Sequence, residues 1–126
     1  MINFKQIYKS YRGRFAVDNL SLKIEEGELF VLLGESGSGK TTSLKMVNRL
    51  IKPDAGQVLL NNIDISEIDA TQLRKGIGYV MQFYGLFPHY TVKENIAIVP
   101  VLLNWDKEKI NRRSAELMAV FGLDPI

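Results

Sequence analysis

One stretch restricts the fold more than any other, and it is "LFVLLGESGSGKTT" at residues 29–42. It opens with five consecutive apolar residues, 29–33, and continues into a glycine-rich loop. A short apolar run bounded by turn residues predicts a strand buried on both faces, as in a parallel sheet. After the loop, Leu44, Val47 and Ile51 recur with helical spacing. The stretch therefore predicts a strand–loop–helix unit, which is typical of α/β proteins.

The loop itself has a spacing with a chemical meaning. "GESGSGKT" matches the pattern G-x-x-x-x-G-K-[ST]. Phosphate oxygens need several backbone N–H donors at once, and glycines allow the backbone to approach them closely. The positive end of the following helix also favours an anion. The predicted phosphate-binding residues are Gly34, Glu35, Ser36, Gly37, Ser38, Gly39, Lys40, Thr41 and Thr42.

Two side chains of this loop have expected roles of their own. Lys40 is suited to reach the β- and γ-phosphates, and the Thr41 hydroxyl is suited to hold Mg²⁺. The alternative is a chance match in a glycine-rich turn. The apolar strand before the loop and the periodic helix after it favour nucleotide binding.

The rest of the chain predicts a mixed α/β domain, in which strands come first and helices alternate with strands later. The expected strands are residues 2–8, 20–24, 57–60 and 77–82. The expected helical segments are a turn at 69–75 capped by Asp69, a helix from Val92 interrupted near Pro100, and a second helix from Asp106.

Size and charge exclude several classes. The chain has 126 residues, a formal charge of +2 and no cysteine. That charge gives no argument for nucleic acid, and the absence of cysteine excludes disulfides. The longest apolar run, "IAIVPVLL", is far shorter than the roughly 20 residues that span a bilayer. We therefore expect a single cytoplasmic domain whose link to any membrane comes through a partner.

Two longer stretches carry a family resemblance that covers essentially the whole chain. "YKSYRGRFAVDNLSLKIEEGELFVLLGESGSGKTT" and "GYVMQFYGLFPHYTVKENI" resemble the opening and the Q-loop region of ABC transporter ATP-binding subunits. The resemblance implies a P-loop ATPase core with an N-terminal antiparallel β part, truncated after the Q-loop region. It implies a mainly β part at 1–28, the P-loop and Q-loop core at 29–91, and the start of a helical subdomain at 92–126. "LKMVNRLIKPDAGQVLL" further resembles importers of quaternary amines such as glycine betaine, carnitine and choline.

The resemblance assigns roles to two residues outside the loop. Tyr11 matches the aromatic residue that stacks on adenine, with a strand aromatic in the core as the alternative. Gln82 matches the Q-loop glutamine, which reaches Mg²⁺ or the attacking water, with an ordinary polar strand end as the alternative. The implied cofactors are ATP and Mg²⁺, and Thr41 and Gln82 are the implied metal ligands.

The resemblance also implies partners. The segment Phe83–Tyr90 corresponds to the region that receives the membrane permease, unless its rings pack inward. His89 within it is expected to be a surface residue. A second ATP-binding subunit and a substrate-binding protein complete the implied complex, on the inner face of the membrane.

The sequence lacks part of the catalytic machinery that the family uses. Hydrolysis needs a further acidic residue for Mg²⁺ and water, which this family supplies at the end of an apolar strand. Asp64 and Asp106 do not fit that pattern, and no "LSGGQ" signature occurs. The catalytic set is incomplete, so we expect ATP binding without turnover. Two alternatives are a small P-loop kinase, for which Arg112 and Arg113 are the only late arginine pair, and a non-catalytic permease-binding module.

Overall fold

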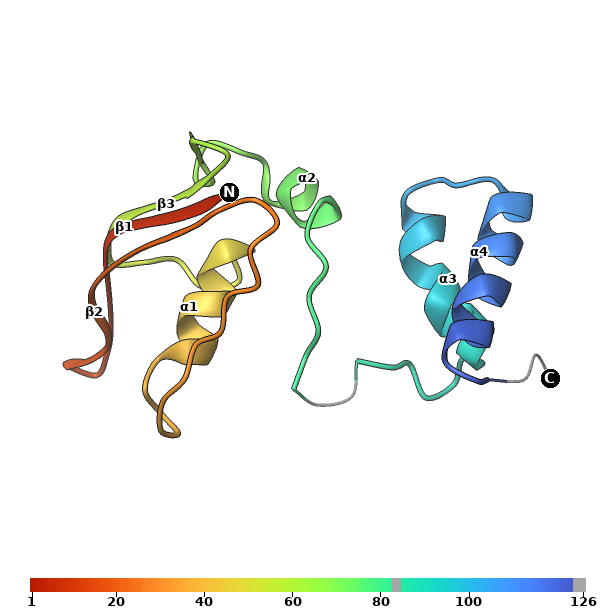
Figure 1. The fold of residues 1–126 in the computed structure, drawn as a ribbon, viewed down its shortest axis with the longest axis horizontal. Coiled ribbons are helices and arrows are strands. Elements are labelled where there is room, and N and C mark those ends of the chain that lie inside the picture. Colours follow the sequence, from red (N-terminus) through yellow and green to blue (C-terminus); the bar gives the residue numbers. More distant parts are fainter. Residues whose placement is uncertain (83–84, 124–126) are drawn as a thin grey trace. The chain divides into compact units, whose positions relative to one another are not determined.

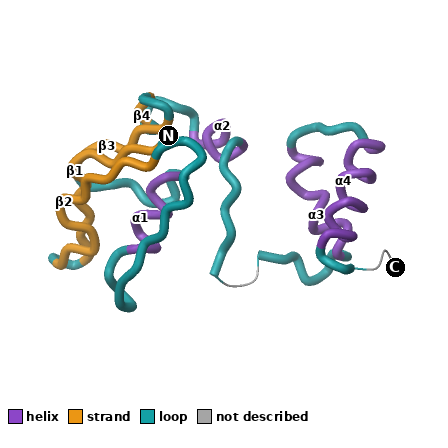
Figure 2. The backbone as a smooth tube through the Cα atoms, in the orientation of Figure 1, coloured by secondary structure: helices purple, strands orange, loops and turns teal. Residues whose placement is uncertain are grey.

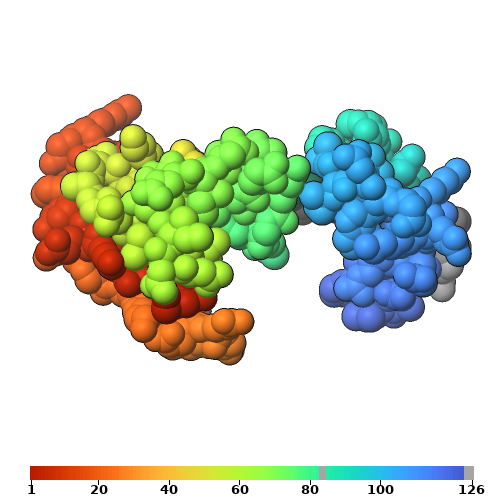
Figure 3. All heavy atoms as spheres, turned by 90° about the horizontal axis from the view of Figure 1, so that it is seen from above, coloured from red at the N-terminus to blue at the C-terminus, as the bar shows by residue number. Residues whose placement is uncertain are grey.

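A computed structural model describes residues 1–82 and 85–123 of the chain (Figure 1). The chain divides into two compact units, Met1–Gly78 and Tyr79–Ile126, drawn with all their atoms in Figure 3. Each unit is described by itself below.

The first unit is built on a four-stranded antiparallel sheet with the order β2-β1-β3-β4. The strands are β1 (Ile2–Tyr11), β2 (Arg14–Ile24), β3 (Ala55–Leu60) and β4 (Ile63–Asp64). A two-residue turn joins β1 to β2, in which Arg12 and Gly13 have φ of 50° and 77°. Two successive residues with positive φ are the hallmark of a hairpin turn whose twist matches the strands. The expected N-terminal antiparallel β part is thus confirmed.

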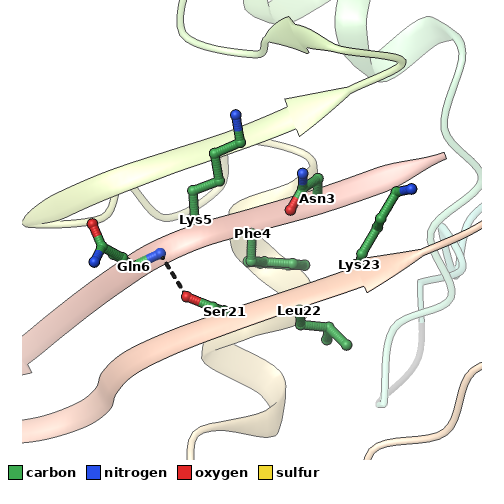
Figure 4. A pocket seen from close by; sticks show the side chains of 7 residues that line it. All are labelled: Asn3, Phe4, Lys5, Gln6, Ser21, Leu22 and Lys23. Carbon is green, nitrogen blue, oxygen red and sulfur yellow. Dashed lines mark hydrogen bonds between the residues drawn. The ribbon is translucent and has the colours of Figure 1, made fainter.

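Strand β1 is irregular at its centre. Its register with both neighbouring strands shifts near Gln6, whose φ is 48°. There the Gln6 N–H donates to the Ser21 hydroxyl at 3.1 Å, as Figure 4 shows. On the other side β3 approaches so closely that a Cβ on Gly56 would lie 2.2 Å from the Gln6 carbonyl oxygen. Glycine at position 56 is therefore a requirement of this bulged sheet.

One face of the sheet is covered by helix α1 (Lys40–Val47), whose Met46 is fully buried. Helix α2 (Ala70–Lys75) closes the unit, and Asp69 caps it by accepting from the N–H groups of Thr71 and Gln72. The strand at 57–60 and the Asp69 cap are confirmed, and the helix after the loop is confirmed in part, because α1 ends at Val47 and does not reach Ile51. The core consists of Phe4, Ile7, Val17, Met46, Val58, Ile65 and Leu73.

The predicted strands at 29–33 and 77–82 are wrong. The structure describes both segments without a strand, and Figure 2 draws them as loop. Leu29 is 91% exposed and Val80 is 95% exposed. An apolar run is buried as a strand only when neighbouring strands satisfy its backbone and cover both faces. Among the described residues, neither segment has such neighbours.

The second unit contains a helical hairpin of α3 (Val92–Leu102) and α4 (Lys107–Val120). The predicted interruption near Pro100 is wrong, because α3 continues through it to Leu102. Pro100 lies in the last turn, where its missing N–H removes only one bond of the helix ladder. Asp106 caps α4 by accepting the Lys109 N–H at 2.7 Å, which confirms the predicted second helix. None of the helices in residues 1–82 and 85–123 has the length and apolar character that a membrane crossing requires.

Candidate phosphate-binding site

The glycine-rich loop ends where α1 begins. Gly39 is the N-cap residue with φ of 87°, and no side chain caps the helix. No acidic residue occupies the first turn of α1. The first N–H groups of a helix lack partners within the helix, and they carry the positive end of its dipole. This helix start is therefore a set of donors suited to an anion.

Lys40 crosses the loop that precedes it. Its ammonium donates to the carbonyl oxygens of Gly34 and Glu35 at 2.7 and 2.6 Å, and to the Ser38 hydroxyl at 3.0 Å. These bonds place a positive charge inside the loop, next to the donors of the helix start. Phosphate oxygens are stronger acceptors for an ammonium than neutral carbonyls are. The donor set thus fits a phosphate group.

The three glycines of the loop serve different purposes. A Cβ on Gly34 would lie 2.8 Å from the Ser38 hydroxyl oxygen and 3.9 Å from the Lys40 ammonium, so Gly34 keeps the inside of the loop open. A Cβ on Gly39 would lie 2.1 Å from the carbonyl oxygen of Ala16 in β2, so Gly39 allows the loop to pack on the sheet. Gly37 has φ of 85° but open space around it, so only its backbone angle demands glycine.

Beside the loop lies a hollow of about 260 Å³ between β2 and the start of α1. Its lining includes Ala16, Asp18, Leu33, Ser38, Lys40 and Ser43. Of the two threonines that follow Lys40, Thr41 is exposed and Thr42 is half-buried. Thr41 therefore lies on the surface at the helix start.

Tyr11 lies at the end of β1, and its side chain is 47% exposed. The structure therefore does not bury it in the core, which was the alternative to base stacking. The loop touches the hairpin close by, because Gly39 packs against Ala16. Ala16 lies between two β2 residues that pair with β1, since Phe15 faces Ser10 and Val17 faces Lys9. At about 3.3 Å per residue, Tyr11 is only one or two strand positions beyond that contact.

The predicted metal ligands fall in different units. Thr41 belongs to the first unit, whereas Gln82 is an exposed residue of the second. The described residues contain no group of three or more His, Cys, Asp or Glu side chains that would hold a metal by itself. The two candidate acids have local uses, because Asp64 accepts the Ser66 N–H and Asp106 caps α4. Any Mg²⁺ here would need ligands from a bound nucleotide.

The segment before α3 presents exposed apolar side chains. Leu86, Phe87 and Tyr90 are all exposed, and the rings of Phe87, His89 and Tyr90 contact one another. His89 itself is exposed, as expected. Phe83 and Tyr84, which the partner hypothesis also included, lie outside the described residues.

Sequence reasoning missed the residues that shape this segment. Asn95 accepts the Phe87 N–H at 2.8 Å and donates to three carbonyl oxygens, those of residues 87, 90 and 91. Thr91 and Glu94 form a capping box at the start of α3. The Thr91 N–H and hydroxyl donate to Glu94, which lowers the pKa of that carboxyl. The spacing T-x-x-E was a signal for this cap.

An uncapped helix start, a glycine loop and a lysine folded over that loop define a P-loop nucleotide-binding protein of the α/β class. The model of one family, described as ABC transporter, matches residues 17–126. The chain therefore belongs to the ABC transporter family.

Several curated proteins and solved structures are similar to the chain. The osmoprotectant import ATP-binding protein OsmV of Salmonella typhimurium is 53% identical over 109 residues, which are 86% of this chain and 28% of that protein. The carnitine transport ATP-binding protein OpuCA of Listeria monocytogenes is 46% identical over 124 residues, or 98% of this chain and 31% of that protein. A dimeric post-hydrolysis structure of the ATP-binding cassette MJ0796 bound to ADP and phosphate has a TM-score of 0.84 and 31% identity. The similar region covers 99% of this chain and 59% of the MJ0796 chain. The chain thus spans under a third of these two curated relatives.

Proposed function

We propose that the chain is the phosphate-loop part of the ATP-binding subunit of an ABC importer, and that it binds ATP with Mg²⁺. The observation that carries the proposal is the position of the Lys40 ammonium inside a loop that leads into an uncapped helix start. Backbone N–H groups of residues 34–42 and the Lys40 ammonium would bind the β- and γ-phosphates. Tyr11 would stack on adenine.

The magnesium ion would arrive with the nucleotide. When bound, Mg²⁺ would neutralise negative charge on the phosphate oxygens. The Thr41 hydroxyl would hold it in the first unit, and the Gln82 amide oxygen would add a second ligand. Because Asp64 and Asp106 have local structural uses, we expect this chain alone to bind Mg-ATP without turnover.

The transported substrate is proposed from the relatives. Their names include import of osmoprotectants and transport of carnitine, choline and glycine betaine. We therefore assign the complete subunit to uptake of such a small osmolyte. Its partners would be a permease contacting the region near Phe83–Tyr90, a second ATP-binding subunit and a substrate-binding protein. The subunit would lie in the cytoplasm against the inner face of the membrane.

Nucleotide binding is tested by calorimetric titration of the chain with Mg-ATP. Replacing Lys40 by Ala should weaken binding by at least about tenfold, because a charge-assisted contact to phosphate is lost. Lys45→Ala is the matched control, since Lys45 lies in the last turn of the same helix. Equal affinity of the Lys40→Ala variant and the unchanged chain would contradict the proposal.

Turnover and partner binding need separate measurements. Steady-state ATP hydrolysis above about 1 per second, abolished by Lys40→Ala, would overturn the expectation of no turnover. Co-purification with a betaine-type permease should be weakened by Phe87→Ala. Phe121→Ala is the control, because Phe121, directly after α4, is an exposed ring too, with 73% of the residue exposed against 48% for Phe87. Equal loss with both variants would argue against a permease site at this segment.

A further inference from the structure

Asp54 lies directly before β3 and beside the end of β1. Its N–H donates to the Tyr8 carbonyl oxygen at 2.8 Å. Its carboxylate accepts the Ser10 N–H at 2.7 Å and the Ser10 hydroxyl at 3.0 Å. Because β3 begins only at Ala55, the end of β1 has no strand on this side. The carboxylate takes the place of that strand and fixes the backbone next to Tyr11.

The other oxygen of the same carboxylate binds Lys9. The Lys9 ammonium lies 2.6 Å from Asp54 Oδ1 and 5.5 Å from the centre of the Tyr11 ring. An ammonium at this distance over an aromatic face is attracted by the π electrons. Lys9 thus occupies one face of the Tyr11 ring, while the Tyr11 side chain remains about half exposed.

We infer that Asp54 and Lys9 position Tyr11 for the nucleobase, with one ring face held by Lys9 and the opposite face presented to a purine. This inference rests on the proposed function, in which Tyr11 contacts the base. A ring that is already fixed loses less freedom when a base stacks on it, so affinity rises. Asp54 also keeps the Lys9 charge at the ring. The phosphates are thereby left to Lys40, and the two lysines serve different parts of the nucleotide.

The charge state of Asp54 suits this role. Donation by Lys9 and by the Ser10 N–H lowers the pKa of the Asp54 carboxyl from 3.8 to about 2. The carboxylate therefore stays ionised, and keeps its hold on Lys9, throughout the neutral range.

The contribution of the base to affinity is separated from that of the phosphates by titrating two ligands into the 126-residue chain. The ligands are ATP and inorganic triphosphate, each with Mg²⁺. Tyr11→Ala should weaken ATP binding about 5- to 100-fold, the range of one lost stacking contact. Asp54→Asn and Lys9→Met should weaken ATP binding about 3- to 10-fold and leave triphosphate binding unchanged within about twofold. Lys23→Met is the matched control, since Lys23 of β2 forms an exposed ion pair with Glu25, just after that strand.

A double-mutant cycle provides the decisive readout. If Asp54 acts through Tyr11, Asp54→Asn should cause no further loss of ATP affinity in the Tyr11→Ala background. Equal weakening of ATP and triphosphate by Asp54→Asn, additive losses, or no loss at all would each overturn the inference. Should Asp54→Asn unfold in a thermal melt, Lys9→Met carries the same test.

The two proposals fail in different ways. If Tyr11→Ala weakens ATP binding while Asp54→Asn and Lys9→Met do not, the positioning role fails and nucleotide binding stands. If the unchanged chain binds ATP no better than triphosphate, the adenine contact fails, and the positioning role fails with it. If the chain binds neither ligand, the proposed function itself is overturned.

Discussion

The antiparallel sheet and the two apolar segments at 29–33 and 77–82 are equally strand-like in sequence, yet only the sheet forms strands. In the sheet, β1 and β2 are joined by a two-residue turn, and β3 pairs with β1. The apolar segments have no strand beside them among the described residues, and their side chains are largely exposed. The difference teaches that an apolar run specifies a strand only together with its neighbours.

The largest expected difference between the sheet and the two apolar segments is the effect of a core substitution on the free energy of unfolding. Ile7→Ala removes a fully buried side chain of β1 and should lower the free energy of unfolding by about 3 to 4 kcal/mol. Val80→Ala, on the unpaired segment, should change it by less than about 0.5 kcal/mol. Urea denaturation followed by far-UV circular dichroism measures both. A comparable loss at Val80 would mean that 77–82 is buried in solution.

Two glycines extend the test to the backbone. A Cβ at Gly56 would collide with the Gln6 carbonyl oxygen, and φ there is 87°, so Gly56→Ala should cost about 2 to 3 kcal/mol. Gly78 has nothing within 4 Å of its added Cβ, so Gly78→Ala should stay within about 0.5 kcal/mol. The same denaturation assay applies. A stable Gly56→Ala chain would show that β3 can move away from the bulge.

The segment before α3 offers an intermediate case, because side chains order it without a strand. Asn95→Ala removes the bonds to residues 87, 90 and 91 and should cost about 1 to 2 kcal/mol. The fluorescence of Trp105, the only tryptophan, reports unfolding of the second unit. Asn111→Ala on exposed α4 surface is the control and should be neutral. Similar losses in both variants would assign the effect to helix stability instead.

The smallest expected effect is the loss of stability when Asp54 is protonated at low pH. The folded pKa of Asp54, about 2, lies below its ordinary value of 3.8. Its stabilising contribution is therefore complete above pH 3.8 and is lost as the pH falls toward about 2. Between about pH 5 and pH 2, the unchanged chain should lose more stability than Asp54→Asn. Parallel pH slopes of the urea midpoint for the two proteins would exclude this coupling.

Much of the fold followed from local sequence signals. Alternation in 20–24, the Asp69 cap and the start of a helix at Asp106 each depend on residues close in the chain, and each was confirmed. The failed strand predictions involve partners distant in sequence, whereas the error at Pro100 has a local cause. Burial of 29–33 needs strands that local pattern cannot supply, and Pro100 was misjudged because its effect depends on its position within the helix.

In the candidate site, too, the features encoded by a continuous stretch of sequence were predicted, and those that join distant residues were not. The spacing of Gly34, Gly39 and Lys40 predicted the loop and the start of α1, since a continuous motif encodes both. The contact of Gly39 with Ala16 and the link from Asp54 to Tyr11 were not predictable, because they join residues far apart in sequence. Asn95 was missed because its bonds depend on the path of the segment before α3.

The contact between Gly39 and Ala16 has a mechanical consequence. A Cβ at Gly39 would lie 2.1 Å from the Ala16 carbonyl oxygen, so the end of the loop is packed against β2 without room for a side chain. Closely packed groups transmit displacement instead of absorbing it. A displacement of the loop's end toward β2 would therefore press on the hairpin that bears Tyr11, and a push on the hairpin would reach the loop. Pressing either one against the other would therefore move both.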